Sequence, residues 1–323
     1  MNLSKHKVLV TGAGGFIGGH LVQTLLKMGS EVTALVSYNS AGSSGTLDEI
    51  GSSVIDHVRI VRGDIRDRST VARAMEGCSV VIHLAGLAAV PYSFDSPESY
   101  VAVNIGGTLN ILEEARRNSC ERVLTTSTAA VYGSPQYLPL DEAHPCSANS
   151  PYGATKIGAE RLSESYYRGF DLPVTTVRPF NTYGPRQSER AVIPSMIAQL
   201  LSGADEIKVG DLGPTRDMVY VGDTARAMIE IAQSLNAAGH EINIATGRET
   251  SIRDIVETLV NQINPEARIV IDPKRCRLKE GQEDRIYGSN SKLRELTGWS
   301  PETSLEEGLK QTIASYRMDS ISR

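Results

Sequence analysis

The sequence predicts an α/β protein with a doubly wound parallel sheet, followed by a smaller α/β domain. Over the first half of the chain, short apolar segments alternate with segments of helical periodicity, which is the pattern of a parallel sheet covered by helices. A glycine-rich turn follows the first of these strands directly. The length of 323 residues suits one large domain or two unequal ones. We expect a first domain at 1–178, to which about 217–246 return, and a second, mainly at 179–323.

The chain is organised around the stretch KVLVTGAGGFIGG, residues 7–19. Its apolar start, 8–10, is predicted to be a buried strand, and the helical pattern begins directly after the turn. Gly12 permits a tight turn, Gly15 leaves the backbone open to a pyrophosphate, and Gly18 lets the helix pack closely on the strand. The free amides and dipole of a helix N-terminus attract phosphate. The sequence therefore predicts a Rossmann dinucleotide-binding fold.

The residues that follow the second strand, Glu31–Val36, distinguish NAD from NADP in this type of fold. An acidic residue there would bond the ribose hydroxyls of NAD, and a nearby Arg would accept the 2′-phosphate of NADP. Residues Ser37–Ser40 supply neither, and no Lys or Arg occurs between Glu31 and Arg59. The lack of a cation favours NAD. The serine- and glycine-rich stretch 40–46 is predicted to be a loop.

The third strand, His57–Arg62, is followed by Asp64. A carboxylate beside the cofactor crevice can accept a hydrogen bond from the adenine amino group. The alternative role for Asp64 is to cap the next helix, which is expected to begin near Ser69.

The fourth strand, Cys78–His83, ends in Leu84-Ala85-Gly86, where small residues let the backbone approach the cofactor. Asn104 lies in a helix predicted from near Ser99 to about Arg117. Asn104 either contacts the cofactor or has a structural role, as a helix cap or as a side chain that hydrogen-bonds two elements together.

The fifth strand, Arg122–Ser127, leads to Thr128, a hydroxyl at the sheet edge where open α/β folds bind ligands. Beyond a loop at 134–150, Tyr152 and Lys156 share one face of a predicted helix, since residues four apart are neighbours on a helix. An ammonium group favours the ionised phenol and would lower its pKa from about 10. Tyr152 is therefore predicted to act as an acid or base near neutral pH. The alternative is a surface Tyr and Lys at helical spacing.

After the sixth strand, Val174–Arg178, the strict alternation weakens. The strand at Ile242–Ala245 could rejoin the parallel sheet, and Ser304 is the expected cap of the last helix. The further helices are expected at 191–201, 223–235, 251–263 and 305–316, and the further strands at 206–209 and 267–271.

Composition and charge exclude several classes of function. The net charge of −5 provides no basic surface for nucleic acid. No apolar run approaches the ~20 residues of a membrane span, and the N-terminus leads straight into a strand, which leaves no room for a signal peptide. The four cysteines are widely spaced and the six histidines form no cluster, so we expect reduced thiols, no metal site and a cytoplasmic location.

Five motifs, in order along nearly the whole chain, resemble the extended short-chain dehydrogenases that act on nucleotide sugars. Finer stretches, 34–40 and 184–188, resemble the 4,6-dehydratases of legionaminic acid biosynthesis. The five motifs are Gly12-x-x-Gly15-x-x-Gly18, Asp64-Ile65, His83-Leu84-Ala85-Gly86, Tyr152-x-x-x-Lys156 and Arg178-Pro179-Phe180-Asn181-x-Tyr183-Gly184-Pro185.

The resemblance implies that Tyr152 takes the proton of a sugar 4-hydroxyl while a hydride passes from C4 to NAD. Thr128 would hydrogen-bond the same oxygen, and Lys156 would bind the nicotinamide ribose and tune Tyr152. The expected cofactor contacts are Gly12, Gly15, Phe16, Ile17, Gly18, Asp64, Ile65, Leu84, Ala85, Gly86, Asn104, Tyr152 and Lys156. The expected substrate contacts are Thr128, Asn181, Arg186, Arg216, Arg277 and Arg285, because an arginine fork can bond two oxygens of a diphosphate.

One departure bears on the reaction. The related dehydratases place a Glu, which removes the C5 proton, three residues before the motif glycine, and this chain has Ala129 and Ala130 there. Since losing a placed base costs about 10²–10⁴ in rate, the sequence favours a 4-epimerase. The alternatives are a 4,6-dehydratase acting on a GDP- or UDP-linked N-acetylglucosamine, a reductase of a preformed 4-keto sugar, and a non-catalytic nucleotide-binding relative.

The resemblance also implies an assembly. Relatives pair two helices across a two-fold axis into a four-helix bundle, so we expect a homodimer formed by the helices near 99–117 and 152–170. The apolar stripes predicted for this contact are Ile111, Leu112 and Ala115 on the first helix and Ile157, Ala159 and Leu162 on the second. The alternative role for these stripes is packing on the sheet.

Overall fold

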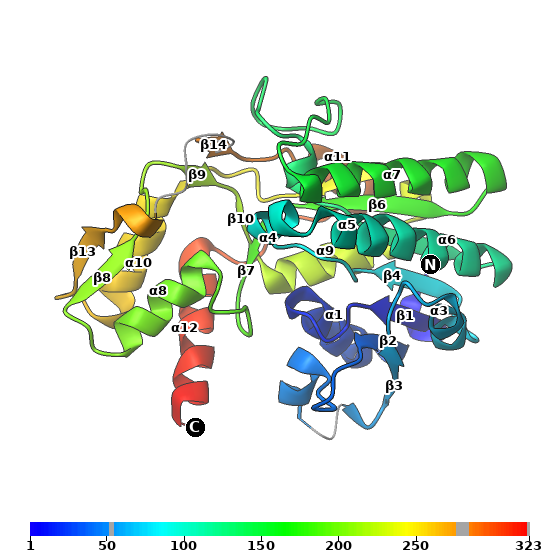
Figure 1. Cartoon of the computed structure of the whole chain (residues 1–323), viewed down its shortest axis with the longest axis horizontal. Helices are drawn as coiled ribbons and strands as arrows, with labels where there is room; N and C mark the ends of the chain where they lie inside the picture. Colours follow the sequence, from blue (N-terminus) through cyan, green and yellow to red (C-terminus); the bar gives the residue numbers. More distant parts are fainter. Residues whose placement is uncertain (52–54, 276–283, 322–323) are drawn as a thin grey trace.

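The computed structural model of the chain describes residues 1–51, 55–275 and 284–321. Figure 1 shows a larger part built on a twisted sheet, beside a smaller part formed mainly by the C-terminal half of the chain. Arg277, predicted to contact substrate, lies outside the described residues.

A seven-stranded sheet forms the centre of the larger part, and all of its strands are parallel. The chain starts in the middle of the sheet and winds outward in both directions, so the order reverses between β1 and β4, where such sheets bind ligands at their carboxyl ends. In spatial order the strands are β11 (Glu241–Ile244), β6 (Val174–Pro179), β5 (Arg122–Thr126), β4 (Val80–His83), β1 (Lys7–Thr11), β2 (Glu31–Ser37) and β3 (Val58–Gly63).

Helices cover both faces of this sheet, which explains why its central strands are almost entirely apolar. Val8, Leu9 and Val10 of β1 are fully buried, as the apolar run predicts. One face packs against α1 (Phe16–Lys27), α9 (Val221–Gln233) and α11 (Ser291–Thr297), and the other against α3 (Arg68–Met75), α6 (Thr108–Arg117) and α7 (Pro151–Phe170). The predicted doubly wound α/β fold is confirmed. The predicted domain boundaries remain a prediction.

The helix expected from Ser99 to Arg117 is broken into three pieces. These are α5 (Pro97–Tyr100), a π-helical segment η3 (Val101–Gly107) and α6. Thr108 donates its hydroxyl to the carbonyl oxygen of Asn104 at 2.6 Å, within the wider turn. Single π-helical turns are rare and often lie at functional sites.

The apolar stripe predicted on α6 does not face a partner subunit. Ile111, Leu112 and Ala115 are all fully buried within the chain, where they pack against the sheet. The alternative role of these residues, packing on the sheet, is therefore the correct one. Side chains that remain exposed on the same segment are Val101 and Leu109, at 51% and 39%.

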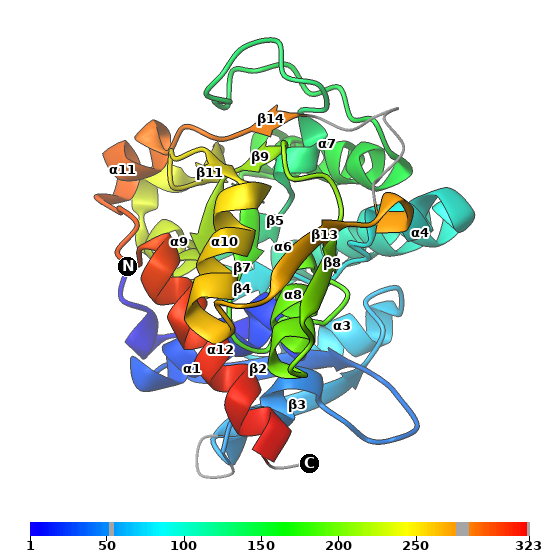
Figure 2. The same ribbon diagram turned by 90° about the vertical axis from the view of Figure 1, so that its left-hand side faces the viewer.

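The smaller part has its own apolar core, formed by two parallel strands and three helices that lie side by side in Figure 2. Ser304 accepts a hydrogen bond from the Glu307 amide and caps the last helix, as predicted. The elements are α8 (Val192–Leu201), β8 (Glu206–Val209), α10 (Ile252–Ile263), β13 (Arg268–Ile271) and α12 (Leu305–Ile321).

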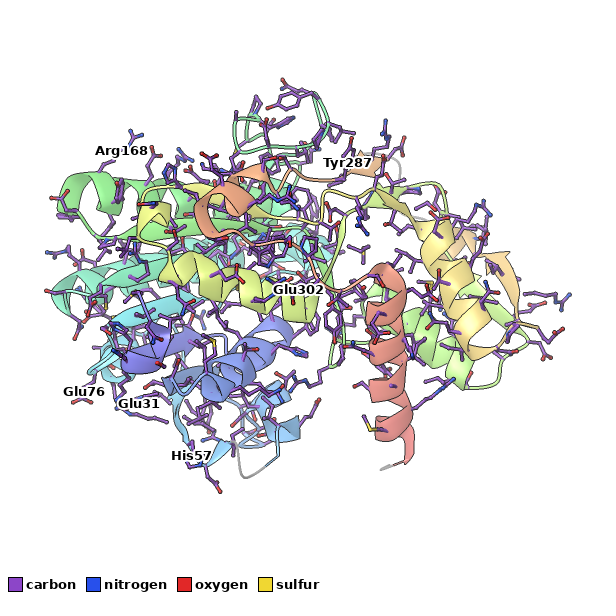
Figure 3. The ribbon with its side chains drawn as sticks, turned by 180° about the vertical axis from the view of Figure 1, so that it is seen from behind. Glu31, His57, Glu76, Arg168, Tyr287 and Glu302 are labelled. Carbon is purple, nitrogen blue, oxygen red and sulfur yellow. The ribbon has the colours of Figure 1, made fainter. Side chains whose placement is uncertain are left out.

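Short strands and turns join the two parts, and Leu140 in the long loop after β5 pairs with the segment around Tyr287, which is labelled in Figure 3. The short strands are β7 (Asn181–Tyr183), β9 (Thr215–Arg216), β10 (Met218–Tyr220), β12 (Thr250–Ser251) and β14 (Arg285–Ile286). The remaining short helices are η1 (Leu3–Lys5), η2 (Gly45–Glu49), α4 (Val90–Asp95), η4 (Ala129–Val131), η5 (Leu235–Ala237) and η6 (Pro273–Arg275).

Candidate active site

The glycine-rich turn between β1 and α1 fits an anionic ligand. Gly12 has φ +68°, and a Cβ at this position would lie 2.7 Å from the Ala85 amide nitrogen. A Cβ at Gly18 would lie 2.2 Å from the Gly12 carbonyl oxygen. Gly15 is the N-cap of α1 and supplies no side-chain hydrogen bond, so the first amides of the helix are not capped. The turn therefore leaves backbone donors and open space for a pyrophosphate.

Gly45 and Thr46, which follow the loop at 40–44, contact the glycine-rich turn between β1 and α1. The Thr46 amide donates to the Gly14 carbonyl oxygen at 3.0 Å, and the Thr46 hydroxyl donates to the Gly15 carbonyl oxygen at 2.8 Å. Gly45, with φ +65°, approaches Gly14 so closely that its Cβ would lie 2.2 Å from the Gly14 oxygen. Sequence analysis did not find this contact, although the extra glycines at 14 and 45 were a signal for it.

A buried hydrogen-bond chain connects the segment after β4 to Asn104. Thr108 uses its hydrogen on the Asn104 carbonyl, so its oxygen accepts from Nε2 of His83 at 3.1 Å. Nδ1 of His83 then accepts from the Thr11 hydroxyl at 2.7 Å, and Thr11 accepts from the Ala85 amide at 3.2 Å. Burial lowers the pKa of His83 to about 3, in agreement with a neutral ring.

Asn104 is a cross-bond between elements rather than a helix cap. Its side chain accepts from the Leu87 amide at 2.9 Å and donates to the Leu87 carbonyl at 3.1 Å and to the Thr155 hydroxyl at 3.1 Å. A Cβ at Gly86 would lie 3.0 Å from the Asn104 side-chain oxygen and 3.2 Å from Nζ of Lys156. Gly86, Asn104 and Lys156 therefore meet, which places three of the predicted cofactor contacts together.

Asp64 does not cap the following helix, because Asp67 does so by accepting from the Ser69 amide. Its carboxylate is instead bonded by the guanidinium of Arg66, which holds the pKa of Asp64 below its usual value. Ile65 is buried beneath η3, where it contacts Gly107.

A cation approaches the loop after β2, contrary to the expectation from sequence. The Arg62 guanidinium, from the neighbouring strand β3, donates to the Gly42 carbonyl at 3.0 Å and to the Ser44 hydroxyl at 2.9 Å. The expectation covered only the segment between Glu31 and Arg59. Pairing of β2 with β3, in which Val36 lies opposite Arg62, is what brings this residue there.

The Thr128 side chain lies close enough to the Tyr152 phenol to lower its pKa. Tyr152 lies in the first turn of α7, which Ser150 caps by accepting from the Gly153 amide at 3.1 Å. Burial raises the pKa of Tyr152, and the nearby Thr128 hydroxyl only partly opposes this effect. The predicted lowering of the pKa by Lys156 is wrong for the chain alone, because burial dominates and Lys156 is not among the groups that shift this pKa.

Lys156 lies one turn beyond Tyr152 on the buried face of α7. Its ammonium donates to the Thr126 carbonyl oxygen at 2.9 Å. Burial lowers the pKa of Lys156 to about 8, although the carboxylate of Glu160 acts in the opposite direction. The hydroxyls of Thr126 and Ser127 are buried and have no partner among the residues that the structure describes. These hydroxyls at the end of β5 fit a bound polar group, such as a nicotinamide ribose.

Glu160 anchors this helix to the sheet through a buried ion pair that sequence analysis did not predict. Arg178 donates to both carboxylate oxygens of Glu160, at 2.8 Å and 2.7 Å, and both side chains are at most 2% exposed. Arg178 also donates to the Tyr132 hydroxyl at 3.1 Å and lies over that ring. The spacing of Lys156 and Glu160, four apart, was the signal that could have found this residue.

A pocket of about 390 Å³ lies between α8, β8 and β9 in the smaller part of the molecule. Asn181 and Arg216, two of the predicted substrate contacts, both line it. Three further cations that sequence analysis did not select also line it: Arg190, Lys208 and Arg275. Its walls are otherwise largely apolar, among them Val209, Pro214, Met218 and Ile252. Cations on apolar walls suit a nucleotide, whose base stacks and whose diphosphate is anionic.

Two other predicted arginines do not line this pocket. Arg186, with φ +65°, donates to Nδ1 of His20 and to Gln23 on α1, both at 3.0 Å, and so ties the smaller part to the cofactor helix. Arg285 donates from two of its guanidinium nitrogens to the two carboxylate oxygens of Glu249, at 2.7 Å and 2.8 Å. Both would have to leave these partners to reach a substrate.

Within residues 1–51, 55–275 and 284–321, no group of three or more potential metal ligands occurs. None of the helices in the same ranges is long and apolar enough to cross a membrane.

Comparisons with known proteins show the family of this chain. The family model described as GDP-mannose 4,6 dehydratase matches residues 9–312. The UDP-glucose 4-epimerase of Mycolicibacterium smegmatis is 33% identical over 96% of this chain and 98% of its own. The dTDP-glucose 4,6-dehydratase of Actinoplanes sp. is 32% identical, over 96% and 98%.

A solved structure shows the same fold with the cofactor. The UDP-glucose 4-epimerase of Thermus thermophilus, in complex with NAD, superimposes with a TM-score of 0.84 at 31% identity, over 96% of this chain and 99% of that one. The glycine turn, the Gly86–Asn104–Lys156 cluster and the orphaned hydroxyls of β5 fit the same dinucleotide. The chain belongs to the extended short-chain dehydrogenase/reductase family of NAD-dependent nucleotide-sugar epimerases and dehydratases.

Proposed function

We propose that the protein is a nucleotide-sugar 4-epimerase, in which Thr128, Tyr152 and Lys156 act on C4 and its hydroxyl. The observation that carries this proposal is the presence of Thr128 beside Tyr152, whose pKa it lowers, together with two alanines, Ala129 and Ala130, in the adjoining helix η4. The site would thus have the residues needed for oxidation at C4. It would have no carboxylate at positions 129 and 130 to remove the C5 proton.

Tyr152 would take the 4-hydroxyl proton and later return it. When bound, NAD accepts the hydride of C4 and gives it back to the opposite face. Thr128 lies beside the Tyr152 hydroxyl, so that both hydroxyls can bond the sugar oxygen. Lys156 carries a positive charge near neutral pH, because its pKa of about 8 remains above 7, and this charge favours the phenolate once a substrate completes the site.

The alanines leave no carboxylate beside the sugar. Ala130 donates its amide to the Thr128 hydroxyl at 3.2 Å, and its carbonyl oxygen would meet a Cβ at Gly153 at 2.9 Å, so residue 130 lies against the first turn of α7. Nearby carboxylates have other partners: Glu160 binds Arg178, and Glu142 accepts from the Asn243 amide at 2.7 Å. Removal of the C5 proton would therefore lack a placed base.

The nucleotide diphosphate would occupy the pocket lined by Asn181 and Arg216. Asn181 begins β7, which follows β6 of the large sheet and pairs with β10. Arg216 ends β9, two residues before β10 begins. A sugar joined to a nucleotide held there could extend toward Tyr152. Arg186 and Arg285 would contribute only after exchange of their present partners.

A 4,6-dehydratase is the second candidate, because the matching family model and one of the compared relatives carry that activity in their descriptions. Chemistry depends on the site rather than on the fold, so the alanines favour epimerisation. A cytoplasmic location remains part of this proposal.

We also propose a homodimer through the outer faces of η3, α6 and α7. The support is that Val101 on η3 and Leu109 on α6 are exposed, and that Ile157 and Leu162 on α7, a helix in contact with both, are only partly buried. Light scattering at micromolar concentration should give twice the monomer mass of 34.9 kDa. A monomer mass would contradict the dimer and leave the proposed activity unaffected.

Product analysis tests the proposed activity. The enzyme is incubated with UDP-, GDP-, CDP- and dTDP-linked hexoses and N-acetylhexosamines, and the products are examined by NMR. An epimerase gives a C4 epimer that keeps its C6 hydroxymethyl group. A C6 methyl doublet would identify a dehydratase, and no turnover with any of these sugars would support a non-catalytic relative.

A further inference from the structure

We propose that Arg62 provides a subsite for a 2′-phosphate on the adenosine ribose, so that the protein binds NADP⁺ as well as NAD⁺. The inference rests on the placement of the dinucleotide at the glycine turn, and it does not depend on whether the reaction is epimerisation or dehydration. The inference also rests on one contact: the guanidinium of Arg62, on β3, lies against the loop that follows β2.

Arg62 reaches the loop that follows β2, the part of this fold that meets the adenosine ribose of a dinucleotide. It donates to the Gly42 carbonyl and the Ser44 hydroxyl, both through one terminal nitrogen. The Ser44 carbonyl oxygen in turn lies against Gly14, where a Cβ would approach it to 2.6 Å. The guanidinium is therefore separated from the phosphate-binding turn by a single loop residue.

Arg62 has no carboxylate partner among the residues that the structure describes, unlike its neighbours along the chain, Arg59 and Arg66. Arg59, on the same strand, pairs with Glu76 at 3.2 Å, and Arg66 pairs with Asp64. Figure 3 labels Glu76 at the outer edge of the molecule. The charge of Arg62 is thus bonded only to neutral oxygens, and its other N–H groups can bind an anion.

The loop itself is suited to a phosphate. Residues 37–47 contain no acid, and four serines, one threonine and one asparagine supply hydrogen-bond donors. The first carboxylate after β2 is Asp48, which is occupied by the Ser43 hydroxyl at 2.7 Å and the Ser44 amide at 2.9 Å. An acidic residue at the end of β2 is what normally bonds the ribose hydroxyls and repels a 2′-phosphate. Its absence removes the usual discrimination against NADP⁺.

Together these features predict weak discrimination between the two dinucleotides. NAD⁺ is held by the glycine turn without a carboxylate on its ribose, and NADP⁺ gains a charge-assisted contact with Arg62 that a planar guanidinium makes through two donors. Figure 1 shows β2 and β3 side by side at the lower edge of the sheet, in agreement with their parallel pairing.

Calorimetric titration of the full chain, freed of any copurified dinucleotide, measures the two dissociation constants directly. We expect the Kd of NADP⁺ to lie within about tenfold of the Kd of NAD⁺. Arg62→Leu should weaken NADP⁺ by about tenfold and NAD⁺ by less than about threefold, since a charge-assisted bond is lost only with NADP⁺. The matched control is Arg59→Leu, which removes a cation from the same strand and should leave the ratio of the two constants unchanged.

A second variant tests the effect of the acidic residue that is absent from the end of β2. Ser37→Asp places a carboxylate at the exposed end of β2 and should shift the ratio toward NAD⁺ by about tenfold or more. The proposal is overturned if wild-type protein binds NADP⁺ more than about tenfold more weakly than NAD⁺. It is also overturned if Arg62→Leu changes the ratio by about threefold or less, since Arg62 would then only brace the loop. Neither result bears on the epimerase assignment, because the measurement is of dinucleotide affinity.

Discussion

The Lys156 ammonium donates a hydrogen bond to the carbonyl oxygen of Thr126, at 2.9 Å, and so ties helix α7 to the end of strand β5. Thr128, two residues later, acts on Tyr152 of the same helix and lowers its pKa. Helix α7 thus contacts both the end of β5 and the residues that follow it. Any substitution here is therefore expected to change both chemistry and the position of the helix, and control variants separate the two effects.

Tyr152→Phe should lower kcat by at least about 10³-fold while leaving the fold and NAD affinity intact. The change removes one oxygen from a buried helix face, and a placed acid or base contributes about 10²–10⁴ in rate. Initial rates, circular dichroism and calorimetric NAD binding are the measurements. Tyr166→Phe, on the same helix but bonded to Glu113, is the control and should keep wild-type activity. Wild-type turnover by the Tyr152 variant would remove Tyr152 from the mechanism.

Thr128→Val should lower kcat by about 10²-fold, because the Tyr152 hydroxyl loses a polar neighbour and the Ala130 amide loses its cap. Thr128→Ser keeps the oxygen for both contacts and should restore activity to within about tenfold of wild type. The Thr128 side chain lowers the pKa of Tyr152. The alkaline rise of kcat/KM should therefore move to higher pH in the valine variant. Wild-type activity in the valine variant would remove the Thr128 hydroxyl from the mechanism.

Lys156→Met should lower kcat by at least about 10²-fold and yet stabilise the fold near neutral pH. The folded chain releases the Lys156 proton at a pKa of about 8, against 10.5 for an exposed lysine. Between these values the unfolded chain binds more protons, so the stability of the wild type rises with pH across this window. Below about pH 8 the buried charge is a constant cost.

The methionine variant lacks that cost, so its Tm at pH 7 should exceed that of the wild type by about 2 °C. The difference should shrink between pH 8 and pH 10.5. Differential scanning calorimetry over this pH range is the test. A variant less stable than wild type at pH 7 would show that the bond to Thr126 outweighs the cost of burying the charge.

Thr11→Val should weaken NAD binding by about threefold to tenfold without changing the chemical step, since an unpaired buried amide costs about 1–3 kcal/mol. Thr11 accepts from the Ala85 amide and donates to His83, and so fixes the segment after β4 that is proposed to contact the cofactor. Thr11→Ser keeps both bonds and serves as the control. If the valine variant bound NAD as tightly as wild type, the chain through His83 would have no part in holding that segment.

Much of the fold follows from local sequence patterns. The apolar run at 8–10, the glycine turn and the helical spacing after it predict β1 and α1 closely, because each depends on neighbouring residues only. The helix expected from Ser99 to Arg117 was wrong in detail. The Thr108 hydroxyl, which donates to the Asn104 carbonyl in this segment, also accepts from His83 on a distant strand, and no local pattern contains such a contact.

The site is predicted less completely, for the same reason. Tyr152 and Lys156 share a helix, so their spacing revealed them, but the balance between burial and charge at Tyr152 requires the packed structure. Arg62 and the Glu160–Arg178 pair act across neighbouring strands or between helix and sheet. Arg186 was chosen for its charge, and its contacts with α1 become visible only in three dimensions.

The most direct test of the central claim is turnover in D₂O followed by proton NMR at C5 of the product. An epimerase oxidises and reduces only C4, so the C5 proton is never removed and the product should keep hydrogen at C5. Dehydration breaks the C5–H bond, expels the 6-hydroxyl and reprotonates C5 from solvent. Ala130→Glu, which places a carboxylate against α7, should create or accelerate elimination by at least about tenfold if residue 130 is where a dehydratase keeps its base. Deuterium at C5 of a wild-type product that carries a C6 methyl group would contradict the epimerase assignment.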